Sequence, residues 1–252
     1  MSDEVIYEVR DKVAYITLNR PTKRNAINPE MRDGLFEAVQ DVQTNTDVWA
    51  AVFRGAGDNF SSGHDLVAMA GGERDSRPTS NLYSEIQYTW KPTFAAIDGY
   101  CLAQGGGIAL SCDIRIATER AFFGWPQVKR GISSTSGPTL LCQRVPLNIA
   151  LEMLFTGDFI DAQTALKYNI VNRVVPTEKL MEEMEALVMK IMSNAPSAVR
   201  AIKEVAVRGL DLNLEQRIKV AGLMGSAVKQ TEDAREGLAA FAEKRQPVWK
   251  GK

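Results

Sequence analysis

Apolar and polar residues alternate in two short stretches at the start of the chain. Residues 5–9 and 13–18 are rich in β-branched side chains, and the charged residues Arg10, Asp11 and Lys12 between them suit a turn. This alternation predicts two neighbouring strands.

The spacing of apolar residues becomes helical after residue 28. Asn28 is of a type favoured at a helix N-cap, and Pro29 suits the first helical position. Apolar residues then recur three or four positions apart, at Leu35, Phe36, Val39 and Val42. The pattern predicts an amphipathic helix.

Strand-like and helical stretches continue to alternate toward the middle of the chain. The apolar runs WAAVFRGAG (residues 49–57), TFAAIDG (93–99) and DIRIAT (113–118) predict strands, and a helix is expected from about Gly107. This order indicates an α/β fold around a core sheet. Related strand-and-helix units recur without a repeated sequence, which is compatible with a spiral of stacked turns.

From about Leu180 the pattern is helical only. We therefore predict an α/β core over residues 1–185 and a helical region over residues 186–252. The apolar, methionine-containing faces of these helices either pack on the core or form a subunit interface.

Composition excludes several classes of partner. The 30 basic and 31 acidic residues leave a formal charge of −1, so neither nucleic acid nor a membrane is expected as a partner. Three widely spaced cysteines and one histidine argue against a disulfide framework and against a metal site. The N-terminus lacks the pattern of a signal peptide, and no apolar run reaches membrane-spanning length. We expect a cytoplasmic protein.

Two glycine-containing turns are the strongest candidates for a functional site. In NFSSGHDL, Gly63 allows an unusual backbone conformation, Asp65 suits the N-cap of a helix from Leu66, and the amide of His64 is left free. In AQGGGIAL, residues 103–110, glycines precede a second helix whose N-terminus favours negative charge. If the two turns converge, their amides form an oxyanion hole suited to a thioester enolate.

The glycines also have a purely structural interpretation, namely close contact between a helix and a strand. They match neither the Walker sequence nor the dinucleotide-binding fingerprint. A third segment, GGERDSRPTSN (residues 71–81), predicts a mobile loop over the site.

Several segments resemble the crotonase (enoyl-CoA hydratase/isomerase) superfamily in the family's order. They are LNRPTKRNAINPEM, FSSGHDL, AAIDGYCLAQGGG, CDIRIATERAFFGWPQVKRGI, EMLFTGDFIDAQTALKYNIVNRVVP and REGLAAFAEKR. The resemblance implies a crotonase-like spiral of ββα units, a C-terminal helical trimerisation region, and a homotrimer or a dimer of trimers. It also implies an acyl-CoA thioester substrate, with coenzyme A as part of the substrate and no separate cofactor. The thioester oxygen would accept hydrogen bonds from the amides of His64 and Gly106.

The resemblance further suggests which residues contact CoA. They are Lys23, Arg24, Ala26, Ser62, His64, Asp65 and Leu66, together with Phe241 and Lys244 reaching a neighbouring subunit. Lys23 and Arg24 are suited to CoA phosphates, although a solvated basic turn explains them equally well.

The chain departs from the resemblance where hydratases of the family carry two glutamates. We place these positions at Ala109 and Gln127. Alanine exchanges no proton, and a glutamine amide orients water without acting as a base. Rapid hydration of the usual kind is therefore in question.

Other polar residues offer alternatives. Ser133 and Ser134 are candidates to line the acyl pocket, while Ser136 or Gly137 suits the N-cap of a helix with Pro138 at its first position. Trp125 is a candidate for the acyl pocket or for the core. Histidine is the residue type that ordinarily exchanges a proton near neutral pH, which makes the imidazole of His64 a candidate base, although the resemblance uses this residue through its backbone.

Three functional hypotheses follow. The first is an acyl-CoA enzyme of the hydratase/isomerase type that catalyses atypical hydration, isomerisation or hydrolysis. The second is a non-catalytic acyl-CoA-binding protein, and the third is a thioesterase. Proton exchange at the α-carbon separates the first from the second, and release of free CoA identifies the third.

Overall fold

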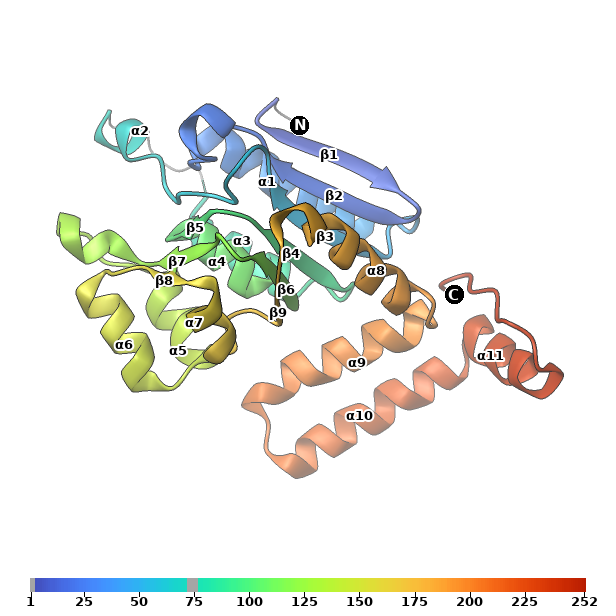
Figure 1. Ribbon diagram of the computed structural model, residues 1–252. Coiled ribbons are helices and arrows are strands. Elements are labelled where there is room, and N and C mark those ends of the chain that lie inside the picture. The colour runs from blue at the N-terminus through green and yellow to red at the C-terminus, as the bar shows by residue number, and fades with distance from the viewer. Residues whose placement is uncertain (1–2, 72–76) are drawn as a thin grey trace.

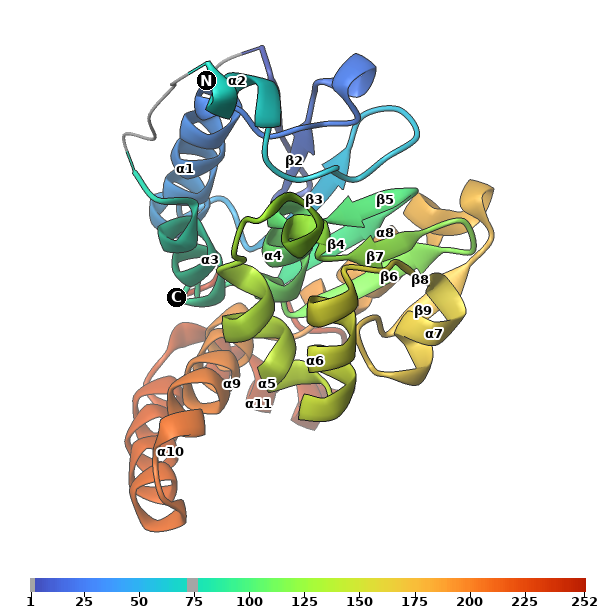
Figure 2. The same ribbon diagram turned by 90° about the vertical axis from the view of Figure 1, so that its left-hand side faces the viewer.

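The computed structural model describes residues 3–71 and 77–252, so residues 72–76 of the predicted mobile loop lie outside the described part. Figures 1 and 2 show an α/β body and a helical C-terminal region that extends from it. The strands are β1 (Val5–Arg10), β2 (Val13–Leu18), β3 (Ala50–Gly55), β4 (Thr93–Ile97), β5 (Tyr100–Leu102), β6 (Ile114–Thr118), β7 (Phe122–Gly124), β8 (Ile160–Asp161) and β9 (Arg173–Val175).

The helices are α1 (Pro29–Thr44), α2 (Leu66–Ala70), α3 (Thr79–Gln87), α4 (Gln104–Ser111), α5 (Cys142–Arg144), α6 (Leu147–Thr156), α7 (Ala162–Lys167), α8 (Leu180–Met192), α9 (Pro196–Arg208), α10 (Leu214–Lys229) and α11 (Glu232–Glu243). A π-helical segment, Gly137–Leu141, precedes α5. Short 3₁₀ segments are Pro21–Lys23, Pro126–Arg130, Thr177–Lys179 and Gly209–Asp211.

Two sheets form the α/β body. The larger has the order β1-β2-β3-β4-β6-β9, in which β1 and β2 are antiparallel and every later pair is parallel. The smaller has the order β5-β7-β8. Because parallel strands need crossover connections, the helices between them cover the sheet faces.

Side chains of the large sheet point alternately into two separate cores. On β2, Ala14 and Ile16 join α1, α3 and α4, whereas Val13 and Tyr15 join the core beneath α8. Both faces of β2 are thus buried, as a central strand of a largely parallel sheet requires.

The two N-terminal strands and the first helix are confirmed. The Asn28 side chain accepts a hydrogen bond of 2.9 Å from the amide of Met31, which makes Asn28 the N-cap of α1. The helix expected from about Gly107 begins three residues earlier, at Gln104. Ala103 precedes it with φ +50° and ψ −110°, so a sharp backbone turn, rather than the glycines, starts the helix.

The predicted boundary between residues 185 and 186 falls inside α8. Leu180, Met184 and Val188 of α8 are buried on the large sheet, so α8 belongs to the body. The change of architecture comes after α8, where α9 and α10 project away from the sheet (Figures 1 and 2). Among residues 3–71 and 77–252, no helix is both long and apolar enough to cross a membrane.

Candidate active site

A cavity of about 630 Å³ lies where the two glycine-containing turns meet. Polar and apolar residues from six segments line it. They are Arg24 and Ala26; Ser62, His64, Asp65, Leu66 and Met69; Pro78, Thr79, Ser80 and Tyr83; Tyr100, Leu102, Ala103 and Gln104; and Pro126, Gln127, Arg130, Ile132, Ser133, Ser134, Thr135 and Ser136, with Phe159.

Backbone hydrogen bonds hold the two turns side by side. Ser61 donates to the carbonyl of Tyr100 (2.8 Å) and accepts from the amide of Leu102 (2.9 Å), so the chain before each turn runs in parallel. Gly63 has φ +94°, and a Cβ atom built on it would lie 2.8 Å from the Cβ of Ala103. Only glycine allows this approach.

Unpaired amides lie at both turns. Among the described residues, the amide N–H groups of His64, Gln104 and Gly106 donate no hydrogen bond. The amides of Gln104 and Gly106 belong to the first turn of α4, whose amides have no partner within the helix. The α4 N-terminus also favours negative charge. The site is therefore suited to an oxyanion.

Each glycine of α4 is pressed against a different neighbour. A Cβ atom on Gly105 would lie 2.7 Å from the Cβ of Ser61, one on Gly106 2.8 Å from the Trp125 ring, and one on Gly107 2.5 Å from the Tyr83 ring. These glycines therefore fulfil the structural interpretation. Gly106 is buried, and Gln104 is the α4 residue among those that line the cavity, while no acceptor is found for the amide of either residue among the described residues.

The two positions expected for family glutamates differ in their surroundings. Ala109 is 2% exposed, packs within the main core and is not among the residues that line the cavity. Its methyl side chain exchanges no proton. Gln127 does line the cavity, and its buried Oε1 accepts no hydrogen bond within the described residues.

Tyr83 occupies the space beside Gly107. It lines the cavity with a side chain that is 5% exposed. Burial raises the pKa of Tyr83 well above its usual range, and a hydrogen bond with Ser136 only partly offsets this effect. The phenol therefore stays protonated and remains a hydrogen-bond donor.

The serine-containing segment has a mixed role. Ser136 Oγ accepts a hydrogen bond from Trp125 Nε1 (3.0 Å) and donates one to the carbonyl of Ala103 (3.1 Å). The capping bond to the amide of Gly137 comes from Ser134 Oγ (3.1 Å), not from Ser136. Trp125 is 1% exposed and packs in the core beside Gly106.

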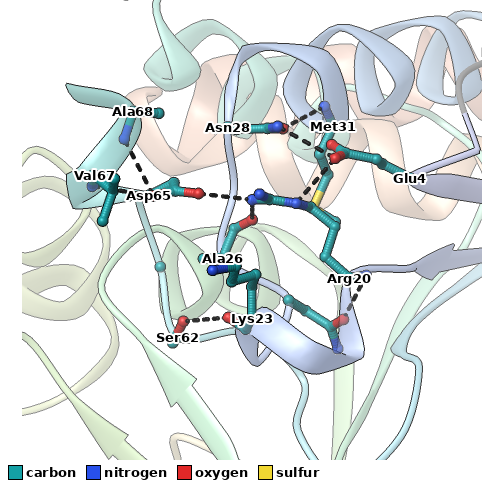
Figure 3. Close-up of polar contacts among 12 residues, drawn as sticks. Glu4, Arg20, Lys23, Ala26, Asn28, Met31, Ser62, Asp65, Val67 and Ala68 are labelled. Carbon is teal, nitrogen blue, oxygen red and sulfur yellow. Dashed lines mark hydrogen bonds and ion pairs between the residues drawn. The ribbon is translucent and has the colours of Figure 1, made fainter. Parts of the chain in front are cut away.

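Asp65 caps α2 and anchors it to the N-terminal segment. Its Oδ1 accepts from the amides of Val67 (3.1 Å) and Ala68 (3.3 Å), as predicted for an N-cap. Its Oδ2 accepts from Arg20 (2.9 Å), whose guanidinium also contacts Glu4, as Figure 3 shows. Burial alone would raise the pKa of Asp65, but the hydrogen bonds from Arg20 and the two amides lower it below its usual value.

The predicted CoA contacts divide into three groups. Arg24, Ala26, Ser62, Asp65 and Leu66 lie together at the cavity, whereas the neighbouring Lys23 is exposed and does not line it. Phe241 and Lys244 lie at the end of α11, far from α2 within the same chain (Figure 1). Phe241 is 86% exposed.

Sequence reasoning missed Arg20, Thr79, Tyr83 and Gln104. Arg20 stands in the segment LNRPTKRN and Gln104 directly precedes the glycines, so both were adjacent to recognised motifs. Tyr83 and Thr79 carried no local signal, because α3 reads as an ordinary amphipathic helix.

Neither metal nor thiol chemistry is indicated by the described side chains. No group of three or more His, Cys, Asp or Glu residues within residues 3–71 and 77–252 is arranged to hold a metal ion. Cys101 and Cys112 are buried, and burial raises the pKa of both thiols far above the usual range. These thiols are therefore unsuited to act as nucleophiles.

Comparison with known proteins agrees with this geometry. Residues 8–252 match the enoyl-CoA hydratase/isomerase family. The chain is 38% identical to (E)-benzylidenesuccinyl-CoA hydratase of Thauera aromatica, over 98% of this chain and 99% of the relative. It is 32% identical to 2,3-dehydroadipyl-CoA hydratase of Escherichia coli, over 99% of both chains. The crystal structure of an enoyl-CoA hydratase from Mycobacterium tuberculosis H37Rv superimposes with a TM-score of 0.94, at 33% identity and full coverage of both chains.

Proposed function

Because the chain belongs to the enoyl-CoA hydratase/isomerase family of the crotonase superfamily, we propose that it stabilises the enolate of an acyl-CoA thioester. The thioester oxygen accepts hydrogen bonds from the amides of His64 and Gly106. The observation that carries this proposal is the pair of unpaired amides at two turns that only glycine allows to touch. Removing one such donor typically lowers the rate about 10²–10³-fold.

CoA enters as part of the substrate, along the side of the cavity formed by Arg24, Ala26, Ser62 and Leu66. The guanidinium of Arg24 lies 5.4 Å from the ring centroid of Tyr100, which keeps its charge at the cavity mouth, where a CoA phosphate is accessible. Further CoA contacts from Phe241 and Lys244 require a second subunit. The exposed apolar side chains of α10 and α11, including Leu214, Ile218, Leu223 and Leu238, support a homotrimer or a dimer of trimers.

We assign the acyl end of the cavity to Gln127, Ser133, Ser134 and Thr135. Four polar side chains favour an acyl group that itself carries polar atoms, because they can donate hydrogen bonds to it and accept hydrogen bonds from it. The two hydratases compared above act, by their names, on benzylidenesuccinyl-CoA and 2,3-dehydroadipyl-CoA, whose acyl groups contain a carboxyl group. We therefore propose reversible hydration of a 2-enoyl-CoA with a polar acyl group.

Gln127 contributes to this reaction by holding water or the product hydroxyl. Gln127 lines the cavity, and its buried Oε1 accepts no hydrogen bond from the described residues. An amide accepts no proton near neutral pH, so Gln127 orients the water without activating it.

A panel of acyl-CoA thioesters in D₂O tests the proposal. We expect 2,3-dehydroadipyl-CoA to lose its enoyl absorbance and gain deuterium at the α-carbon, faster than crotonyl-CoA. Release of free CoA without hydration would indicate a thioesterase, and movement of the double bond would indicate an isomerase. Tight CoA binding without α-proton exchange on any thioester would contradict enolate chemistry and favour a binding protein.

A further inference from the structure

We propose that the imidazole of His64, oriented by the side-chain amide of Gln104, carries the proton in this cavity. The inference rests on the proposed enolate chemistry and adds to it the acid–base group that Gln127 does not supply. His64 would thus act twice, through its backbone amide on the thioester oxygen and through its ring on the α-carbon.

Five other ionisable side chains line the cavity. Four of them are unsuited to exchange a proton, and the fifth is the phenol of Tyr100. Arg24 and Arg130 stay cationic. Asp65 is held as a carboxylate by Arg20 and two amides, and buried Tyr83 stays protonated. The described lining contains no glutamate and no lysine. Histidine is the residue type that ordinarily gains and loses a proton near neutral pH.

Gln104 fixes one nitrogen of the imidazole. Its Nε2 lies 2.7 Å from His64 Nδ1 and 3.2 Å from Thr79 Oγ1, so three segments of the chain meet at one amide. Within the described residues, His64 Nε2 makes no hydrogen bond to the protein. Nδ1 is therefore the anchored nitrogen, and Nε2 is left for substrate or water.

One orientation of this amide suits a ring that takes up and returns a proton at Nε2. With Gln104 Nε2 toward Nδ1, the amide donates, and the neutral ring carries its proton on Nε2, where it accepts no second proton. After a half-turn of the amide, Oε1 accepts from a protonated Nδ1, and Nε2 is a base. The Thr79 hydroxyl both donates and accepts, so it keeps its bond in either orientation. In the present orientation Gln104 Oε1 is buried without a hydrogen-bond partner. Turning the amide therefore breaks no hydrogen bond of this oxygen.

In the proposed hydration, His64 both accepts the proton and returns it. His64 Nε2 takes a proton from water as the water oxygen bonds to the β-carbon, and the π electrons move to the thioester oxygen as an enolate. The enolate then collapses, and its α-carbon takes the proton back from Nε2. One water is added across the double bond, and the imidazole returns to its initial state.

The first test replaces the ring and keeps the backbone amide. For His64→Gln we expect hydration of 2,3-dehydroadipyl-CoA to lose about 10²–10⁴-fold in kcat, with KM and CoA affinity changed less than about threefold. For His64→Ala, added imidazole should restore part of kcat in a saturable manner. If His64→Gln keeps kcat within about threefold, the ring has no catalytic role and His64 acts through its amide alone.

The second test addresses Gln104 as a positioning residue. Gln104→Leu should lower kcat, whereas Gln104→Glu should retain more of it, because a carboxylate still accepts from a protonated Nδ1. Gln163→Leu, at an exposed glutamine of α7, is the matched control and should leave kcat unchanged. Equal kcat in Gln104→Leu and Gln104→Glu would overturn the positioning role.

The two proposals fail in different ways. A wild-type protein that neither hydrates 2,3-dehydroadipyl-CoA nor exchanges α-protons on any tested thioester would refute the proposed function and this inference with it. A wild-type protein that is active while His64→Gln is equally active would refute only the inference.

Discussion

At the scale of single residues, the three glycines of α4 show how much one missing side chain decides. Each faces a different neighbour, and the contact at Gly105 involves the backbone of Ser61, whose carbonyl oxygen would lie 2.9 Å from an added Cβ atom. The contacts at Gly106 and Gly107 involve side chains of Trp125 and Tyr83. Backbone yields less readily than a side chain, so Gly105 is the least replaceable of the three.

Gly105→Ala should therefore destabilise the protein by about 1–3 kcal/mol through overpacking, despite the better helix propensity of alanine. Gly222→Ala in α10 is the matched control, because a Cβ atom there meets nothing within 4 Å. The control should be neutral or stabilising by up to about 1 kcal/mol. Urea unfolding measures both, and equal stability of the two variants would contradict the packing argument.

We expect opposite outcomes when a glutamate is introduced at the two positions where the family carries one. Ala109→Glu places an unpaired carboxylate in the core and should cost about 4 kcal/mol or more, with no gain of activity. Gln127→Glu places a carboxyl at the cavity wall, where burial should raise its pKa toward the range useful for acid–base catalysis.

We therefore expect Gln127→Glu to increase crotonyl-CoA hydration about 10²-fold or more. Soluble yield and urea unfolding measure the stability of Ala109→Glu. Loss of enoyl absorbance measures the hydration rate of Gln127→Glu. A stable, more active Ala109→Glu protein would show that residue 109 faces the substrate after all.

At the scale of elements, α2 is a short helix whose position depends on a few polar contacts. It has five residues, none of them buried, and it presents Leu66 and Met69 to the cavity. Asp65 caps it and pairs with Arg20, which also donates to the carbonyl of Ala26 (2.6 Å), as Figure 3 shows. This network connects the proposed CoA side of the cavity to the turn that carries the His64 amide.

Asp65→Asn keeps a capping side chain but loses the ion pair, and Asp65→Ala loses both. We expect Asp65→Ala to cost about 0.5–2 kcal/mol more than Asp65→Asn. KM for the acyl-CoA should rise in both, because α2 is less firmly held. Denaturant unfolding and steady-state kinetics provide the measurements.

The contribution of the Asp65 charge should depend on pH. Its folded pKa lies below the usual 3.8, so the folded state binds fewer protons than the unfolded state as the pH approaches that value from above. The stabilisation is thus full above the usual pKa and is lost as the pH falls through the folded pKa. The difference in unfolding free energy between wild type and Asp65→Asn should be constant near pH 7 and vanish at low pH. A difference that grows on acidification would contradict the ion-pair assignment.

At the scale of the whole molecule, the C-terminal segment joins α11 to the body. Trp249 Nε1 donates to the carbonyl of Ser193 (2.7 Å), just after α8. The buried Asp233 of α11 accepts from the amides of Lys250 (2.7 Å) and Gly251 (2.9 Å). The position of α11, and with it that of Phe241, therefore depends on this segment.

Deletion of residues 249–252 should lower Tm by roughly 5 °C, since it removes two hydrogen bonds to a buried carboxylate. Hydrogen exchange should accelerate in α11 more than in the sheet. Trp249→Phe is the milder comparison, because it removes only the bond to Ser193. Unchanged exchange in α11 after the deletion would show that other contacts hold this helix.

The sequence by itself determined the elements whose cause is local. Alternation predicted β1 and β2, Asn28 and Asp65 identified two helix starts, and the two free-amide turns were placed within a few residues. These features depend on side chains and backbone only a few residues apart, so they are readable along the chain. The motifs likewise identified the family.

Only the tertiary structure decided which residues face the cavity. The rotation of α4 about its axis puts Gln104 at the cavity, Gly106 against Trp125 and Ala109 in the core, and that rotation is set by Ser61, Trp125 and Tyr83 from other segments. The pairing of His64 with Gln104 spans 40 residues, and that of Arg20 with Asp65 spans 45. Such contacts arise from the packing of a helix on two strands, and no pattern within either segment determines it.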